Sequence, residues 1–137
     1  MRAFWDTNLF IYLLEDHPTF SSIVLRLYDE LRTGGGELWT SALTLGELCT
    51  RPMKAGRLDL VEQYRGLLLD GNVKLVSFDA ATALEYASIR ATTPLKQPDA
   101  MQVACAIQCA ATAFYTNDHQ LTRASPIRGL AINGIRD

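Results

Sequence analysis

Short apolar runs alternate with longer amphipathic stretches along this chain, and the two patterns predict different elements. The short runs indicate strands, and the longer stretches, in which apolar residues recur every three or four positions, indicate helices. The predicted strands are 2–6, 37–40, 73–78, 113–115 and 130–132. The predicted helices are 8–15, one through 20–31, 42–54, 58–70, 80–91 and 98–112, with one more helical turn within 116–122.

Residues that favour helix ends agree with these boundaries. Ser41 and Asp79 precede predicted helices and can cap them by accepting backbone N–H bonds. Pro98 suits the first turn of a helix, and Gly56 suits a helix end. The three glycines at 34–36 lack the Gly-Lys-Ser/Thr ending of a phosphate-binding loop, so we interpret them as a plain turn.

Strands that alternate with helices are typical of a parallel sheet covered on both faces. We therefore expect an α/β fold, a three-layer α/β/α sandwich with a short, mostly parallel central sheet of four to five strands. A length of 137 residues suits one domain with one core, so residues 1–137 are expected to form a single unit. A composition of 48% hydrophobic and 20% charged residues is that of an ordinary soluble globular protein.

Charge and cysteine content exclude several classes of protein. The formal net charge of −2 does not indicate a strongly basic nucleic-acid binder, although a local basic patch or bound cations can reverse the sign where it matters. Asp6 interrupts the N-terminal apolar stretch, and no apolar run reaches the length of a membrane span, so we expect neither a secretory signal nor a membrane segment. Three cysteines without a CxxC motif predict reduced thiols in a cytoplasmic protein.

Four acidic residues stand in distinctive local sequences where an apolar run meets a turn or a helix. They are Asp6 in Phe-Trp-Asp-Thr-Asn, Glu47 in Thr-Leu-Gly-Glu-Leu, Asp99 in Gln-Pro-Asp-Ala-Met-Gln and Asp118 in Tyr-Thr-Asn-Asp-His. Asp6 and Asp118 follow the first and fourth strands, at the sheet edge where ligands bind in open α/β folds. Because grouped carboxylates repel one another and lose hydration, they need a counter-charge, and a hard divalent cation such as Mg²⁺ or Mn²⁺ is suited to oxygen ligands.

Each acid taken alone also has a purely structural interpretation. Asp6 and Asp118 could cap helices, and Asp99 could complement a helix dipole. Glu47 could form a capping box with Thr44. Ser41, three residues before Thr44, is an alternative cap for this helix. If Ser41 is the cap, Glu47 lies too far inside the helix to take part in a capping box. This favours the joint interpretation of the four acids as one site.

These four segments, in this order, resemble the PIN domain, a family of metal-dependent nucleases, and above all its small VapC-like members. The resemblance extends from residue 4 to about residue 130. It rests on Asp6-Thr7-Asn8 after the first strand, Thr40-Ser41 followed by Glu47, Pro98-Asp99-Ala100 leading into an alanine-rich helix, and Thr116-Asn117-Asp118. The chain departs from the family where His119-Gln120-Leu121 follows, since the family often has another acid and an aromatic residue there.

The resemblance implies a PIN-like fold and endoribonuclease cleavage of RNA with one or two Mg²⁺ or Mn²⁺ ions. It implies that Asp6 and Asp99 are the main metal ligands and that Asp118 binds directly or through water. Glu47 would bind a second ion or orient the attacking water. Hydrolysis of this kind leaves a 5′-phosphate and a 3′-hydroxyl.

Other residues are candidates for supporting roles. Asn8 and Thr116 can form hydrogen bonds to the carboxylates or to a water molecule and so fix their positions without binding the metal themselves. The cations expected to contact RNA phosphates are Arg51, Lys54, Arg57 and Lys96, although a solvated helix end explains the first three equally well. We interpret His119 as a surface residue rather than a general acid.

The same resemblance implies a homodimer held inactive by a cognate antitoxin protein. Apolar residues of the early helices could form partner surfaces or belong to the core, and these are Phe10, Tyr12, Leu13, Phe20 and Leu27. Three alternatives remain open: a PIN-domain nuclease of RNA processing outside toxin–antitoxin systems, a non-catalytic RNA- or protein-binding module, and a phosphatase-type hydrolase with Asp6 as nucleophile. The last commonly has a second acid two residues on, where this chain has Asn8.

Overall fold

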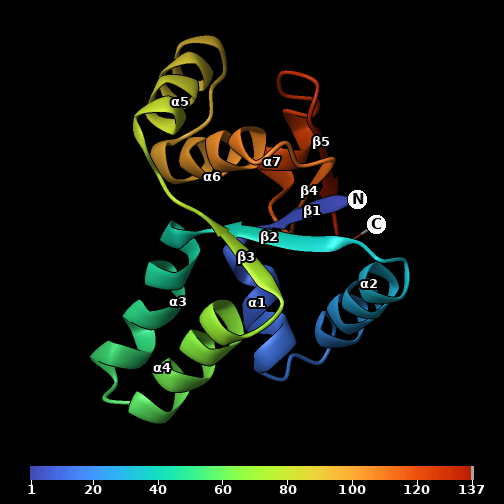
Figure 1. The fold of residues 1–137 in the computed structure, drawn as a ribbon, viewed down its shortest axis with the longest axis vertical. Coiled ribbons are helices and arrows are strands. Elements are labelled where there is room, and N and C mark those ends of the chain that lie inside the picture. Colours follow the sequence, from blue (N-terminus) through green and yellow to red (C-terminus); the bar gives the residue numbers. More distant parts are fainter. Residues whose placement is uncertain (137) are drawn as a thin grey trace.

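Five parallel strands form the centre of the molecule in the computed structural model, which describes residues 1–136 (Figure 1). The strands are β1 (Arg2–Trp5), β2 (Glu37–Ser41), β3 (Val73–Val76), β4 (Ala113–Thr116) and β5 (Ala131–Gly134). Their order across the sheet is β3-β2-β1-β4-β5, and every neighbouring pair is parallel. The predicted α/β fold with a parallel sheet is therefore confirmed.

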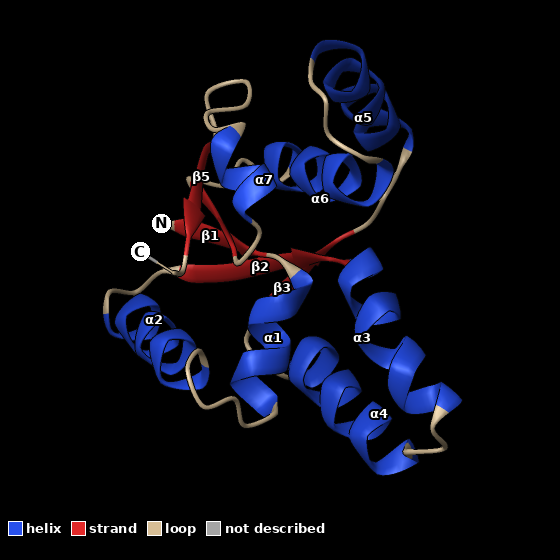
Figure 2. Ribbon diagram, turned by 180° about the vertical axis from the view of Figure 1, so that it is seen from behind, coloured by secondary structure: helices blue, strands red, loops and turns tan. Residues whose placement is uncertain are grey.

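Helices cover both faces of this sheet. The α-helices are α1 (Thr7–Leu14), α2 (Ser21–Thr33), α3 (Ala42–Lys54), α4 (Leu58–Arg65), α5 (Ala80–Thr92), α6 (Gln97–Gln108) and α7 (His119–Arg123). Figure 2 shows α1 to α4 on one side of the sheet and α5, α6 and α7 on the other. Three layers result, as the alternation of strands and helices predicts.

The alternation of side chains along β1 divides the core in two, because successive residues of a strand point to opposite faces. Phe4 is fully buried on the α6 side, where its ring stacks on Phe114 of β4 with centroids 5.3 Å apart. Trp5 packs on the α1 side, against Leu9 and Phe10. Two apolar clusters thus hold β1 at the centre of the sheet and fix the position of its carboxyl end.

Several predicted boundaries are corrected by the structure. The helix predicted over 98–112 ends at Gln108, because Ala110 adopts a left-handed conformation with φ of 57° that no α-helix can continue through. The helix predicted over 58–70 is α4 followed by a turn of π-helix, η1 (Gly66–Asp70). Strand β1 ends at Trp5, one residue earlier than predicted, which leaves the next residue free to cap α1.

The apolar residues of the early helices belong largely to the core. Phe10 is completely buried, and Tyr12, Leu13, Phe20 and Leu27 are half-buried against the cluster that surrounds it. All three cysteines are buried and free. Within residues 1–136, no helix combines the length and the apolar character that crossing a membrane requires.

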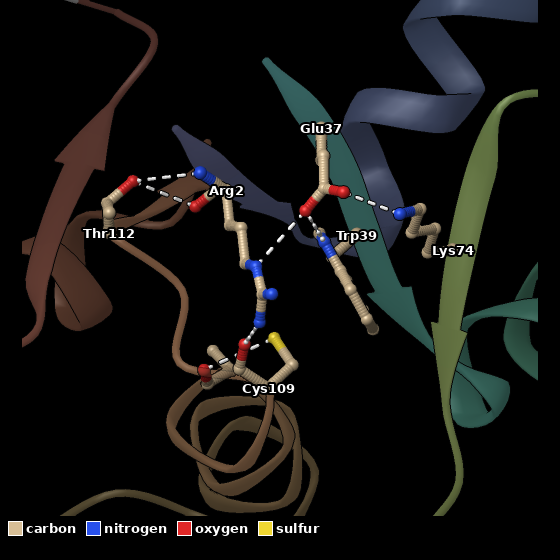
Figure 3. A network of polar contacts seen from close by, with 7 residues as sticks. Arg2, Glu37, Trp39, Lys74, Cys109 and Thr112 are labelled. Carbon is tan, nitrogen blue, oxygen red and sulfur yellow. Dashed lines mark hydrogen bonds and ion pairs between the residues drawn. The ribbon is translucent and has the colours of Figure 1, made fainter.

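A polar network ties the strands together at their amino ends (Figure 3). Glu37 at the start of β2 pairs with Arg2 at 3.1 Å and with Lys74 of β3, and it accepts a hydrogen bond from Trp39 Nε1. The guanidinium of Arg2 also donates to the backbone carbonyl of Cys109 at 2.8 Å. At this edge of the sheet the acidic side chain is therefore fully compensated by cations.

Candidate functional site

Asp6 stands at the carboxyl end of β1 and caps α1. Its Oδ1 atom accepts the backbone N–H of Thr7 at 2.8 Å, and its Oδ2 atom accepts the hydroxyl of Thr116 at 2.8 Å. The same hydroxyl oxygen of Thr116, fully buried at the end of β4, accepts the backbone N–H of Asp118 at 3.0 Å. One threonine therefore connects the two acids that follow the central strands.

The protonation of Asp6 depends on its neighbours. Burial raises the pKa of this carboxyl from 3.8 to about 6, while the hydrogen bonds from Thr116 and Thr7 act in the opposite direction. The negative charges of Asp99 and Glu47 raise the pKa further. Three acids from three different elements are thus close enough to repel one another.

Asp99 lies half-buried in the first turn of α6. Its pKa is raised by burial first and then by the charges of Asp118 and Glu47, whereas the nearby Lys96 lowers it. Asp118 is also half-buried, and its Oδ1 atom accepts the backbone N–H of Gln120 at 2.8 Å as the cap of α7. The charges of all four predicted acids therefore meet at the carboxyl edge of the sheet.

Glu47 reaches this group from the second turn of α3. The hydroxyl of Ser41 accepts the backbone N–H of Thr44 and caps this helix, so the capping-box interpretation of Glu47 is wrong. Instead, Glu47 Oε1 accepts hydrogen bonds from the hydroxyl of Thr7 at 3.0 Å and from the side-chain amide of Gln102 at 3.1 Å. These bonds direct the carboxylate toward α1 and α6, away from the backbone of its own helix.

Gln102 is the functional candidate that the sequence reasoning missed. Its side chain is 2% exposed, its Oε1 atom accepts the hydroxyl of Ser41 at 2.6 Å, and its Nε2 atom donates to Thr44 Oγ1 at 2.8 Å and to Glu47. The opposite amide orientation would place two acceptor oxygens against each other, so the N–H group must face the carboxylate. A lone amide one turn after Asp99, in an otherwise apolar helix interior, is the signal that could have revealed it.

The other predicted residues lie around this centre at different distances. Asn8 is exposed in the first turn of α1, and His119 is exposed at the start of α7. Arg51 and Lys54 are exposed in the last turn of α3. Arg57 is engaged elsewhere, because its guanidinium makes two 3.0 Å hydrogen bonds to the carboxylate of Asp59. Lys96 directly precedes α6 and is the predicted cation whose charge reaches Asp99.

The two edges of the sheet differ in their electrostatics. At the amino edge, cations hold the pKa of Glu37 below its usual value, with the hydrogen bond from Lys74 as the main cause. Among residues 1–136, none of the four acids at the carboxyl edge forms an ion pair. Since uncompensated carboxylates that repel one another lower the stability of the fold, their presence together indicates a function rather than a structural role.

The donor set of this site fits a hard divalent cation. All four side chains offer carboxylate oxygens, the ligands that Mg²⁺ and Mn²⁺ prefer. Within the described part of the chain, no three acidic, histidine or cysteine side chains stand close enough together to form a ready-made ion cage. Mg²⁺ does not require such a cage, since it is usually held by one or two carboxylates together with water and substrate phosphates.

Comparisons with known proteins agree with this geometry. The family model described as the PIN domain matches residues 3–125. The fold is similar to that of VapBC2 from Rickettsia felis bound to a promoter DNA fragment, with a TM-score of 0.77, 19% identity and 98% of each chain covered. It is also similar to VapBC-1 from nontypeable Haemophilus influenzae, with a TM-score of 0.74, 20% identity and 100% of each chain covered.

A third similar structure is VapC20 from Mycobacterium tuberculosis, a toxin that cleaves the sarcin–ricin loop. The TM-score is 0.71 at 15% identity, and the match covers 91% of this chain and 96% of the other. At such identities the similarity concerns the fold. No curated protein sequence matches the chain significantly.

Proposed function

Because the chain belongs to the PIN domain family, we propose that it is a metal-dependent endoribonuclease that hydrolyses RNA phosphodiester bonds. The observation that carries the proposal is the meeting of four acids at the carboxyl edge of the sheet, none of which forms an ion pair within residues 1–136. Similar folds are found in the VapBC2 and VapBC-1 structures and in VapC20, a toxin that cleaves the sarcin–ricin loop. They support the further proposal that this chain is the toxin of a toxin–antitoxin pair.

In this proposal, Asp6, Asp99 and Asp118 hold one or two Mg²⁺ or Mn²⁺ ions. Such an ion, when bound, lowers the pKa of a water molecule and offsets the charge that develops on the phosphoryl and leaving oxygens. Glu47 either contributes to a second ion or orients the attacking water. The products are a 5′-phosphate and a 3′-hydroxyl.

The chain's own residues prepare this reaction by fixing carboxylate oxygens. Thr116 donates to Oδ2 of Asp6 and accepts the backbone N–H of Asp118, so one side chain links these two acids. Gln102 and Thr7 both donate to Oε1 of Glu47. That leaves its Oε2 atom, which has no hydrogen-bond partner within residues 1–136, to accept a proton from the attacking water.

The proposal includes partners. A cognate antitoxin that placed a positive side chain among the four carboxylates would block metal binding directly, because it would supply the counter-charge itself. A homodimer in the cytoplasm is part of the same proposal. A PIN-domain nuclease of RNA processing would share this site and differ in substrate and partner, and an antitoxin gene next to this one distinguishes the two.

Two other functions fit the site less well. A non-catalytic RNA-binding module gains nothing from clustered negative charge, since RNA phosphates are anionic. A phosphatase needs Asp6 as a free nucleophile, whereas both of its carboxylate oxygens accept hydrogen bonds, from Thr7 and Thr116. A covalent phospho-aspartate after turnover would favour the phosphatase.

Cleavage of a pool of structured RNAs by purified protein, freed of any copurifying partner, tests the proposal. Reactions with Mg²⁺ or Mn²⁺ are compared with reactions in EDTA, for the wild type and for Asp6→Asn and Asp99→Asn. We expect metal-dependent cleavage that both substitutions abolish. Asp29→Asn, which removes an exposed acid on α2, is the matched control and should cut normally. The absence of both cleavage and Mn²⁺ binding by calorimetry would refute the proposal.

A further inference from the structure

A chain of hydrogen bonds runs past Asp118, from the segment that follows β5 to helix α1. Nε of Arg136 donates to Oδ1 of Asn117 at 2.6 Å, and Nδ2 of Asn117 donates to the hydroxyl of Tyr12 at 2.9 Å. A guanidinium offers only donors, so the oxygen of the amide must face Arg136, and this fixes the amide's orientation. Asn117 therefore ties the turn between β4 and α7 to two elements that are distant in the sequence.

Asn117 stands at a sensitive position in this turn. It is 9% exposed and lies directly between Thr116 and Asp118. The hydroxyl of Thr116 already binds the carboxylate of Asp6 and the backbone N–H of Asp118. A rotation of the backbone at residue 117 would therefore shift Asp118 relative to Asp6. The two hydrogen bonds of the Asn117 amide oppose such a rotation from both sides.

Aromatic rings support both partners of this amide. The guanidinium of Arg136 lies over the ring of Phe20, 5.2 Å from its centroid, and the ring of Tyr12 packs against Phe20 at 5.1 Å. The ring of His17 stacks on the same phenyl group at 4.9 Å, and its Nδ1 atom accepts the backbone N–H groups of Thr19 and Phe20. Cation–π and ring contacts thus hold the donor and the acceptor of the amide in place.

The packing of the segment after β5 does not depend on Arg136. Ile135 is 4% exposed in the apolar cluster around Trp5, and its backbone N–H donates to the carbonyl of Thr116 at 3.0 Å. Arg136 itself is exposed, so shortening it opens no cavity in the core. Its loss would instead leave Oδ1 of the largely buried Asn117 without a partner, and the amide would turn toward water.

We infer that Arg136 is a positioning residue, which acts through Asn117 to hold the backbone that presents the carboxylate of Asp118. The inference rests on the proposed function, in which Asp118 is a metal ligand. Groups that orient a ligand without touching the ion commonly change metal affinity about 10- to 100-fold. The segment after β5 thus becomes part of the catalytic machinery, although none of its residues faces the ion.

Two substitutions separate the hydrogen bond from the charge. Arg136→Gln keeps an N–H donor at the place of Nε, because both nitrogens are bonded to Cδ, whereas Arg136→Met removes the donor. Tyr12→Phe breaks the same chain at its other end by removing the hydroxyl. Arg26→Met, which removes an exposed cation from α2, is the matched control.

Amide hydrogen exchange in EDTA, followed by NMR, tests the inference without metal or RNA. The backbone N–H of Gln120 is bonded to Oδ1 of Asp118, so its protection reports how firmly that carboxylate is held. We expect exchange at Gln120 to become about five- to tenfold faster in Arg136→Met and Tyr12→Phe, and to stay at the wild-type rate in Arg136→Gln and Arg26→Met. The N–H of Thr82, in the equivalent cap bond to Asp79, should not change in any variant.

Three results of this experiment would overturn the inference. Unchanged exchange at Gln120 in Arg136→Met would show that the donor holds nothing. Equal acceleration at Thr82 would show a general loss of stability. The same acceleration in Arg136→Gln would show that the cation, and not the hydrogen bond, is responsible.

Calorimetric titration with Mn²⁺ asks whether Arg136 acts through Asp118. Arg136→Met should weaken Mn²⁺ binding about five- to tenfold in the wild-type background and should add nothing to the loss caused by Asp118→Asn. An equal loss in both backgrounds would contradict the inference, because Arg136 would then act on another part of the site.

Failure of the positioning role and failure of the nuclease give different results. If the wild type cuts RNA in Mn²⁺ while Gln120 keeps its protection in Arg136→Met, the nuclease stands and the positioning role fails. If Gln120 loses protection in Arg136→Met but the wild type neither binds Mn²⁺ nor cuts RNA, then Arg136 holds Asp118 and the proposed nuclease fails.

Discussion

The side-chain amide of Gln102 on α6 donates to Oε1 of Glu47 on α3 across 3.1 Å. The two residues are 55 positions apart in the sequence, and the helices that carry them cover opposite faces of the sheet. The bond passes beyond the carboxyl ends of the strands, where both helices begin. It connects the helix that carries Asp99 to the carboxylate of Glu47.

Replacing Gln102 by Leu should therefore reduce cleavage without displacing a ligand. We expect a loss of about 10- to 100-fold in activity, the usual effect of removing a group that orients a metal-binding carboxylate. Stability should fall by about 1–3 kcal/mol, because buried hydroxyls lose their partner. The effect should appear in kcat, since the freed Glu47 no longer holds a fixed orientation. Gln108→Leu, the same change at an exposed position on the same helix, is the control.

A merely structural role would give another result. If Gln102→Leu lowers the Tm but each folded molecule cuts RNA at the wild-type rate, then the amide only supports packing. Gln102→Glu sharpens the comparison, because a second carboxylate opposite Glu47 adds repulsion where the amide gives attraction.

Asp6 should make the metal-free protein less stable as the pH rises. Its pKa is about 6 in the folded protein and 3.8 as the ordinary value, so between these values the folded state binds more protons than the unfolded state. The contribution of Asp6 to the free energy of unfolding is therefore most favourable below about pH 4. It falls between about pH 4 and pH 6 and stays low above pH 6. The expected loss is on the order of 3 kcal/mol.

The difference in unfolding free energy between wild type and Asp6→Asn isolates this effect. Urea unfolding in EDTA at several values from pH 4 to pH 7 should show the variant becoming progressively more stable than the wild type, because Asn still caps α1 but carries no charge. A residue that destabilises the fold and yet is essential for cleavage is placed there by function. A difference that does not change with pH would contradict the explanation.

Some features of this site could be predicted from the sequence, and others became visible only in the structure. The alternation of strands and helices was sufficient to predict the parallel sheet. Because ligands bind at the carboxyl ends of the strands in such sheets, the same alternation placed Asp6 and Asp118 at one edge. Both predictions depend only on local pattern and topology. The hydrogen bonds of Gln102 could not be predicted, since Ser41 is its partner 61 positions away and no sequence period relates them. The end of α6 at Gln108 was missed for a similar reason. Ala110 takes a left-handed conformation that its residue type does not favour.

Divalent metal should offset the loss of stability that Asp6 causes as the pH rises. Mn²⁺ at about 100 times its Kd should stabilise the fold by about 2.7 kcal/mol. This gain should shrink as the pH falls through about 6, because protons compete with the ion for Asp6. Thermal unfolding with and without Mn²⁺ at pH 7.5 and pH 5 measures it, and Asp99→Asn should abolish most of the gain at both values. An equal shift in Tm at both pH values and in the variant would indicate binding elsewhere.

Substitutions of Thr116 can distinguish an effect on metal binding and cleavage from an effect on the stability of the fold. Its buried hydroxyl donates to Asp6 Oδ2 at 2.8 Å and accepts the backbone N–H of Asp118 at 3.0 Å, so Thr116→Val removes both bonds while preserving shape. The bond to Asp6 lowers the pKa of that carboxyl, and its loss should raise the pKa and strengthen competition by protons.

We therefore expect Mn²⁺ affinity and cleavage to fall by about 10- to 100-fold in Thr116→Val, with the larger loss at pH 6. Thr116→Ser keeps the hydroxyl and should restore both, whereas Thr112→Val, an exposed threonine before the same strand, should change neither. Calorimetric titration with Mn²⁺ at pH 6 and pH 8 measures the affinities. If serine fails to restore them, the methyl group of Thr116 matters more than its hydroxyl, and the proposed coupling of Asp6 to Asp118 is wrong.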